Sequence, residues 1–181
     1  MLKTHYCGEL KKNLKGTKVT LAGWVDRRRD HGELIFIDLR DRTGIAQVVF
    51  NPQISKQCHE IAGQVRSEFV LQVTGEVALR PAGTENLKLP SGEIEVIVSE
   101  AEILNTSKTP PFYINEDSDV DENVRLKFRY LDLRRERMLK NLILRDNVIR
   151  FMRDFFHDKG FLDVETPIMV NGYARAAYKN K

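Results

Sequence analysis

The sequence has little of what membrane proteins, disulfide-rich proteins and metal proteins need. Only two of its 181 residues are cysteines. Cys7 and Cys58 lie too far apart for a metal-ligand motif or a disulfide framework, so we expect two buried free thiols. No apolar run approaches the roughly 20 residues that span a bilayer, and the first residues form no apolar signal core. These absences argue against a membrane protein and favour a cytoplasmic location.

Catalytic and metal-binding motifs are also missing. The sequence has no GxGxxG or Walker-type loop, and nothing in it indicates covalent catalysis. The histidines are dispersed along the chain: His5, His31, His59 and His157. We therefore expect no metal and no cofactor in this chain.

Overall charge gives only a weak indication of the partner. The formal net charge is +3, but residues 1–104 hold 14 basic and 14 acidic side chains and are formally neutral. Attraction to nucleic acid would have to come from local clusters of charge.

What the sequence does contain is the pattern of a small, mainly β domain. Alternating or β-rich runs predict about five strands, with a charged loop over 27–33 and a short helix within 55–67. The expected strands cover residues 18–26, 34–40, 45–50, 68–79 and 93–99, and the last of them can run on towards residue 104. Five strands with a helix between the third and fourth are typical of an OB-fold, a Greek-key barrel. A generic small β-barrel is the alternative.

The pattern changes after this predicted barrel. We expect an OB domain over residues 1–104, an acidic and proline-containing linker over 105–122, and a different structure over 123–181. From about residue 134 to 159 the apolar residues have helical spacing, and Gly160 is suited to end that helix. A short strand is expected over 161–165, and Pro167 would end it.

The first candidate site is the run Arg27-Arg28-Arg29-Asp30-His31, which begins with three consecutive arginines. Arginine forms forked hydrogen bonds with phosphates and base edges, and it stacks on bases. The alternative is an ordinary solvated run of charge.

The second candidate is a pair of side chains on one face of a hairpin. If the turn over 41–44 pairs Arg40 with Ile45, then Asp38 lies opposite Gln47 and Phe36 lies near Gln47 on the outer face. An exposed aromatic ring beside an amide suits the stacking and reading of a base. The alternative for Phe36 is packing under the loop as part of the core.

The third candidate is the pair of carboxylates Glu93 and Glu95 on the last predicted strand. A carboxylate can accept hydrogen bonds from the N–H groups of guanine. The alternative is a solvent-exposed strand face.

Taken together, several strings resemble one family, the bacterial aspartyl-tRNA synthetases. The strings that resemble its OB domain are CGEL at 7–10, GWVDRRRDHG at 23–32, LIFIDLRDRTGIAQVVF at 34–50 and GEIEV at 92–96. RLKFRYLDLRR at 125–135 resembles the junction into the catalytic domain, and KGFLDVETP at 159–167 resembles class II motif 1.

This resemblance implies an OB-fold that binds the tRNA anticodon loop. Phe36 then matches the aromatic residue that stacks on the central anticodon base, and Gln47 matches the residue that reads the edge of that base. Arg29, with Arg27 beside it, matches the arginine of the same site. Glu95 matches the carboxylate that recognises the first base, a guanine or its modified form.

Two further positions are expected near the third anticodon base, namely His31 and the loop that starts at Arg80. A histidine at position 31 resembles the members of the family that charge asparagine tRNA as well as aspartate tRNA. We therefore expect aspartate tRNA as a partner. If the chain belongs to the group with this histidine, we expect asparagine tRNA as a second partner.

In the family, motif 1 lies at a dimer interface. The resemblance implies this role for Phe156, Gly160, Phe161 and Pro167. We therefore expect either a homodimer or pairing with a full-length synthetase through this segment.

Residues after Pro167 do not follow the expected family pattern, and motifs 2 and 3 are missing from the sequence. We expect the chain to bind tRNA but not to catalyse aminoacylation alone, because adenylate formation needs fixed cations around the triphosphate. ATP and magnesium are expected only in the full-length enzyme. The alternatives are a stand-alone OB module for single-stranded nucleic acid, and a non-functional fragment that pairs through motif 1.

Overall fold

The computed structural model describes residues 2–87, 89–115 and 119–166. It divides into two compact units, Met1–Tyr113 and Ile114–Lys181, called here the barrel unit and the helical unit. The division falls inside the predicted linker of residues 105–122. The domain bounds expected from the sequence stay a prediction.

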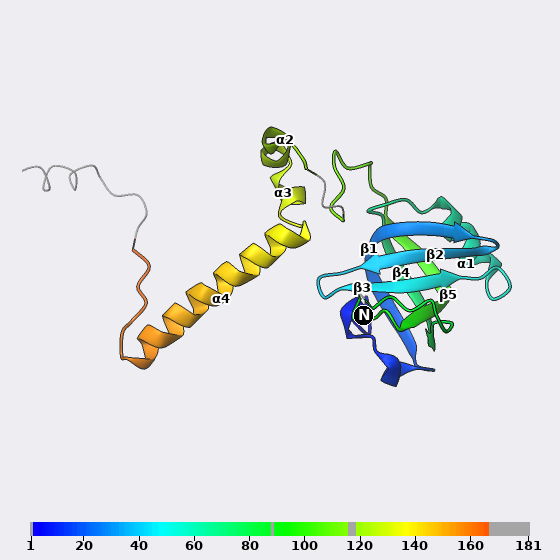
Figure 1. Cartoon of the computed structure of the whole chain (residues 1–181), viewed down its shortest axis with the longest axis horizontal. Coiled ribbons are helices and arrows are strands. Elements are labelled where there is room, and N and C mark those ends of the chain that lie inside the picture. Colours follow the sequence, from blue (N-terminus) through cyan, green and yellow to red (C-terminus); the bar gives the residue numbers. More distant parts are fainter. Residues whose placement is uncertain (1, 88, 116–118, 167–181) are drawn as a thin grey trace, which may run out of the picture. The chain divides into compact units, whose positions relative to one another are not determined.

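The barrel unit is a closed five-stranded barrel with a helix after the third strand (Figure 1). Its elements are β1 (Lys18–His31), β2 (Leu34–Arg40), β3 (Ile45–Phe50), α1 (Lys56–Gln64), β4 (Val70–Leu79) and β5 (Ile94–Asn105), after two short 3-10 turns, η1 (Cys7–Glu9) and η2 (Lys12–Leu14). The strands follow the order β1-β2-β3-β5-β4 around the barrel. Strands β3 and β5 pair in parallel, whereas the other neighbouring strands of the described barrel pair antiparallel. This arrangement confirms the predicted OB-fold.

Side-chain alternation along β2 explains how the barrel encloses its core. Ile35, Ile37 and Leu39 are almost fully buried, whereas Phe36 and Asp38 between them keep partial exposure. Strand β2 pairs with β3 in the predicted register, so that Asp38 lies opposite Gln47. The turn that sets this register is closed by a hydrogen bond from Asp41 N to Gly44 O of 3.0 Å. The predicted hairpin is confirmed.

The predicted loop over 27–33 is wrong, because β1 continues through it to His31. A bulge after Val25 shifts the register, and Arg27 and Arg29 then pair with Asp38 and Phe36 of β2. Only Gly32 and Glu33 remain for the turn, with Gly32 at φ +58°. Charged side chains made this segment resemble a loop, but pairing with β2 satisfies its backbone.

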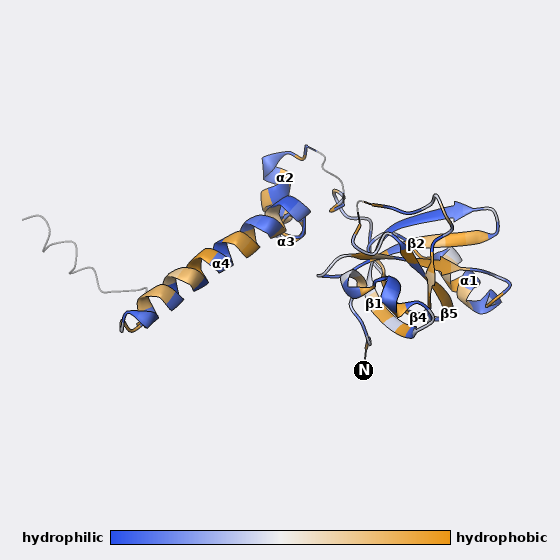
Figure 2. Ribbon diagram, turned by 60° about the horizontal axis from the view of Figure 1, so that its bottom comes forward, coloured by the Kyte–Doolittle hydropathy of each residue, from blue (hydrophilic) through white to orange (hydrophobic). Residues whose placement is uncertain are grey.

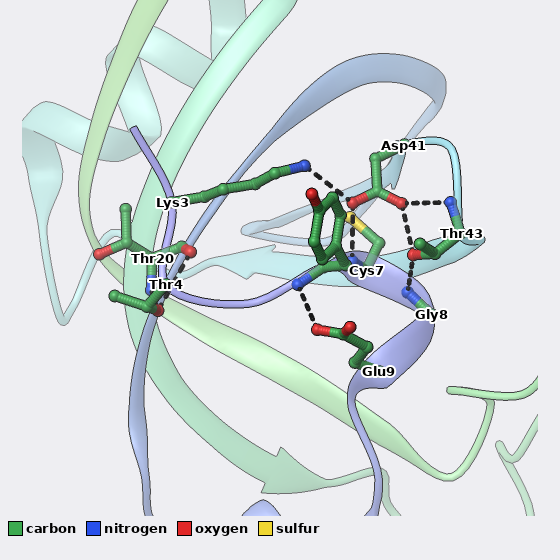
Figure 3. Close-up of polar contacts among 9 residues, drawn as sticks. Lys3, Thr4, Cys7, Gly8, Glu9, Thr20, Asp41 and Thr43 are labelled. Carbon is green, nitrogen blue, oxygen red and sulfur yellow. Dashed lines mark hydrogen bonds and ion pairs between the residues drawn. The ribbon is translucent and has the colours of Figure 1, made fainter. Parts of the chain in front are cut away.

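The segment before β1 is fixed to the β2–β3 turn by the Asp41 carboxylate (Figure 3). Asp41 accepts hydrogen bonds from Cys7 N at 2.9 Å and from Thr43 N at 2.8 Å. Burial alone would raise the pKa of Asp41, but these hydrogen bonds and Lys3 lower it overall. Burial, followed by the nearby Asp41 charge, raises the pKa of Cys7 to about 12. Cys7 and Cys58 are both free and buried, as predicted.

In the described residues of the helical unit, two short helices are followed by a long one: α2 (Glu122–Lys127), α3 (Arg129–Asp132) and α4 (Glu136–Asp158). Gly160 ends α4 at φ +84°, with hydrogen bonds from Gly160 N to His157 O and from Phe161 N to Phe156 O. This is the Schellman pattern, which favours glycine. The strand expected over 161–165 is wrong, because no strand is formed there. In the described residues this segment has no strand to pair with.

Helix α4 carries both hydrophobic and hydrophilic residues along its length (Figure 2). Four of its apolar residues are each 39–51% exposed: Leu142, Ile149, Met152 and Phe156. In the described part of the chain, no helix is long and apolar enough to cross a membrane.

Candidate nucleic-acid interface

One side of the barrel wall has a hollow of about 680 Å³, called here the wall pocket. The predicted site residues that line it are Arg29, His31, Phe36, Gln47, Arg80 and Glu95. They come from four strands and from the loop after β4, and they span residues 29–95. Six of the seven predicted anticodon-binding residues therefore lie in one place.

A continuous chain of polar contacts connects four strands of the barrel wall. The Arg29 guanidinium donates to Asp38 Oδ1 at 2.7 Å and to Gln47 Oε1 at 3.3 Å. Gln47 Nε2 donates to Glu95 Oε2 at 2.9 Å. The strand pattern placed Asp38 and Gln47 opposite each other, but it gave no indication that Arg29 would bridge them or that Glu95 would accept from Gln47.

The side chains of Phe36 and Gln47 are less exposed than predicted. Gln47 is only 6% exposed, because β5 closes against β3 and brings Glu95 over its amide. Phe36 is half-buried and lines the wall pocket. A ring packed on one side still offers its other face to a planar ligand, and a buried amide discriminates more strongly among hydrogen-bonding partners than an exposed one.

Arg80 is a buried cation in the lining. It is 8% exposed, and its Nε donates to Ile94 O at 3.0 Å. Among the described residues, its Nη2 atom has no hydrogen-bond partner. A buried donor without a partner costs free energy. An incoming acceptor would therefore be favoured at this position.

Charges around the pocket are balanced. Burial raises the pKa of Glu95, opposed by the Gln47 hydrogen bond and by Arg80. Burial likewise raises the pKa of Asp38, opposed chiefly by Arg29, and burial lowers the pKa of Arg80. Two carboxylates beside two guanidiniums favour a neutral ligand with donors and acceptors over a bare phosphate.

The three consecutive arginines have three different surroundings. Arg29 belongs to the wall pocket. Arg28 forms an ion pair with Asp30 at 2.8 Å and donates to Gly63 O, also at 2.8 Å, at the end of α1. Arg28 is thus a structural residue that binds the last carbonyls of a helix. Arg27 is exposed on β1 beside Asp38 and is not among the residues that line the pocket.

The two carboxylates of the third candidate also separate. Glu95 is 9% exposed and lines the wall pocket, whereas Glu93 precedes β5 and pairs with Lys12 at 2.6 Å. Asp30 and Pro81 also line the pocket, and they belong to the predicted charged run and to the predicted loop that starts at Arg80. Sequence reasoning did not identify the other residues of the lining: Leu34, Val49, Asn51, Ile54, Thr84 and Ile97. Most of these are apolar or come from loops, and no local pattern sets them apart.

The predicted motif 1 residues lie in the helical unit. Phe156 and Phe161 are 48% and 61% exposed, and their rings contact edge to face at 5.6 Å between centroids. Gly160 forms the turn between them. Pro167 lies outside the described residues. Within the described residues, no group of three or more potential metal ligands lies together.

Two family models match the sequence. The model described as "OB-fold nucleic acid binding domain" matches residues 19–104. The model described as "tRNA synthetases class II (D, K and N)" matches residues 121–180. The second match runs beyond Pro167, so the expected departure from the family at that point is wrong as far as residue 180.

Similar proteins include the aspartate–tRNA(Asp/Asn) ligases of Dehalococcoides mccartyi, 59% identical, and Syntrophomonas wolfei, 52% identical, each over 98% of this chain. The chain spans only 29% and 30% of these two relatives. Among solved structures, asparaginyl-tRNA synthetase from Pyrococcus horikoshii matches 94% of this chain and 38% of its own, with a TM-score of 0.80 and 29% identity. A putative aspartyl-tRNA synthetase from Leishmania major, at 23% identity, covers 94% of this chain and 36% of its own and shares the fold with a TM-score of 0.82.

Proposed function

Because this chain belongs to the aspartyl-tRNA synthetase family, as an OB-fold domain followed by the start of a class II synthetase domain, we propose that it binds the anticodon loop of tRNA through the wall pocket. The observation that carries the proposal is the polar chain Arg29–Gln47–Glu95 beside the ring of Phe36. An aromatic ring stacks on any base, and the polar groups beside it read the edge of that base.

Each residue has a role that its chemistry suits. Phe36 stacks on the central anticodon base, and Gln47 reads the edge of that base with one acceptor and one donor. Glu95 accepts hydrogen bonds from the N–H groups of the first base, a guanine. Arg29 holds the Gln47 carbonyl. Arg27, exposed on the same strand, supplies positive charge towards the RNA backbone.

A binding titration tests this proposal. The barrel is expected to bind the anticodon stem-loop of aspartate tRNA and to lose about 1–3 kcal/mol when the central base is changed. Gln47→Ala is expected to remove most of that difference, because no amide remains to read the edge. Fluorescence titration of labelled stem-loops measures both quantities. Equal affinity for every central base would instead indicate a general module for single-stranded nucleic acid.

His31 and Arg80 are assigned to the third anticodon base. His31 is exposed, and Arg80 offers the Nη2 donor described above. We propose that this part of the pocket accepts both aspartate and asparagine tRNA. The same titration with the asparagine stem-loop is its test, and a large preference for the aspartate stem-loop would exclude it.

The raised pKa of Glu95 predicts opposite pH effects on binding and on stability. Glu95 must be ionised to accept from guanine, so RNA binding is expected to weaken as the pH falls through the raised pKa, above the ordinary value of 4.5. The folded state also holds the Glu95 proton more tightly than the unfolded state. Its contribution to the free energy of unfolding therefore falls as the pH rises through the same window.

Titrations over a range of pH and urea unfolding curves measure the two effects. Glu95→Gln is expected to flatten both pH profiles. Glu93→Gln is the matched control, because Glu93 is exposed and paired with Lys12 outside the wall pocket. A pH profile of binding that is unchanged in Glu95→Gln would contradict the assignment of Glu95.

The remaining roles concern the longer relatives. We propose that Phe156, Gly160 and Phe161, with Pro167, contribute to pairing with a second copy or with a full-length synthetase. We propose that ATP and magnesium are used only together with the rest of the catalytic domain. On this proposal the chain binds tRNA in the cytoplasm and does not aminoacylate it alone.

A further inference from the structure

We propose that Asp38 is a positioning residue for the reading of the central base. It holds the Arg29 guanidinium in place, and Arg29 fixes the orientation in which the Gln47 amide offers its acceptor and its donor to the bound base. This inference rests on the proposed function of the wall pocket and goes one step deeper into it.

Asp38 is the more firmly held member of its ion pair with Arg29. Its side chain is 16% exposed, whereas that of Arg29 is 50% exposed, and the two are joined at 2.7 Å. Asp38 is fixed on β2 between the buried Ile37 and Leu39 and is not among the residues that line the wall pocket. A long, half-exposed arginine side chain loses much rotamer freedom when it is fixed. The short, well-packed aspartate is what fixes it.

The contacts at the two ends of the Gln47 amide allow only one orientation. A guanidinium only donates hydrogen bonds, and an ionised carboxylate only accepts them. Gln47 Oε1 therefore faces Arg29, and Gln47 Nε2 faces Glu95. A reversed amide would oppose donor to donor at one end and acceptor to acceptor at the other. Without Asp38 to hold Arg29, one of these two constraints is lost.

The sign of the change in RNA affinity distinguishes a positioning role of Asp38 from a purely electrostatic one. RNA is a polyanion, so a nearby carboxylate weakens binding unless that carboxylate also has a favourable structural role. Removing the charge of Asp38 should strengthen binding if only the overall field matters. If Asp38 positions Arg29, the same substitution should weaken binding.

The test is the affinity of Asp38→Asn for the aspartate stem-loop, measured with the matched and the changed central base. We expect about tenfold weaker binding of the matched stem-loop, the loss of one hydrogen bond to a charged group, and a smaller ratio between the two stem-loops. Glu102→Gln is the matched control, since it makes the same charge change at an exposed position of β5. It is expected to leave the affinity unchanged or slightly higher.

A double-mutant cycle identifies the route of the effect. In an Arg29→Ala background, Asp38→Asn is expected to cause no further weakening, because its only role is to hold Arg29. If Asp38→Asn does not fold, Asp38→Glu replaces it. The longer carboxylate keeps the net charge but displaces the guanidinium, and it should also weaken binding.

Two outcomes would overturn the inference alone: equal or tighter binding by a folded Asp38→Asn protein, or the same weakening with and without Arg29. If the wild-type chain does not bind the stem-loop, the proposed function fails, and the inference fails with it.

Discussion

Replacing Arg40 by alanine is expected to lower the free energy of unfolding of the barrel unit by about 3–5 kcal/mol. The Arg40 guanidinium pairs with Asp26 and, at 2.6 Å, with Glu68. The side chains of both acids are only 9% exposed. Alanine at position 40 removes the counter-ion that the two buried carboxylates share, which costs much more than the loss of a surface ion pair.

Glu68 adds to the expected effect because of its backbone. It has φ +65°, a left-handed conformation that costs free energy in a residue other than glycine. Its N–H donates to Val25 O at 2.8 Å, which fixes the start of the chain into β4. The ion pair with Arg40 helps to hold this conformation, so its loss should also loosen the closure of β1 against β4.

Urea unfolding measures the effect. Arg66→Ala is the control, since Arg66 is exposed in the same unit, and its loss should change the free energy of unfolding by roughly 0.5 kcal/mol or less. Adding Asp26→Asn and Glu68→Gln to the Arg40→Ala variant should recover part of the loss, because the buried charges are then gone. An Arg40→Ala protein as stable as Arg66→Ala would show that this ion-pair network does not stabilise the fold.

The largest effect on binding is expected from Phe36→Ala. It should weaken binding of the aspartate stem-loop by about 1–3 kcal/mol, the contribution of stacking one base on an aromatic ring. Stacking depends little on which base is present. Phe36→Ala is therefore expected to weaken binding of all stem-loops alike, whereas Gln47→Ala acts on the difference between them.

Tyr113→Ala is the matched control for Phe36→Ala. Tyr113 is another aromatic residue of the barrel unit, 43% exposed and outside the wall pocket. It should leave stem-loop affinity unchanged in the same titration. Because Phe36 is half-buried, thermal unfolding of the variant must be checked. Unchanged affinity in a folded Phe36→Ala protein would remove the base-stacking role.

The hairpin that carries Phe36 and Gln47 could be predicted because its information is local. The Asp41–Gly44 turn sets the register, and strand periodicity then fixes which residues share a face. The periodicity of α4 and the glycine that ends it were equally local, and both were predicted.

The family resemblance pointed to Arg29, Arg80 and Glu95, but their contacts in the wall pocket could not be predicted, because these contacts join distant segments of the chain. Arg29 reaches Gln47 only because β1 extends past its predicted end to pair with β2. Glu95 reaches Gln47 only when β5 joins β3. The burial of Arg80 and the binding of Arg28 to the end of α1 likewise involve residues far apart in the sequence. In these cases single-sequence periodicity contains no information about the partner.

The parallel seam between β3 and β5 has a consequence for how the protein is made. It joins Val48 to Val96 and Val49 to Ile97, so the N-terminal three strands leave the ribosome long before the strand that closes the ring. Until then their sheet has open edges, which are prone to pairing with other chains. Pairing of strands so distant in the sequence is also slow, because the intervening chain must be ordered before the contacts between β3 and β5 can stabilise the barrel. The open sheet edges of the nascent chain are therefore prone to pairing with other chains until β5 has been synthesised.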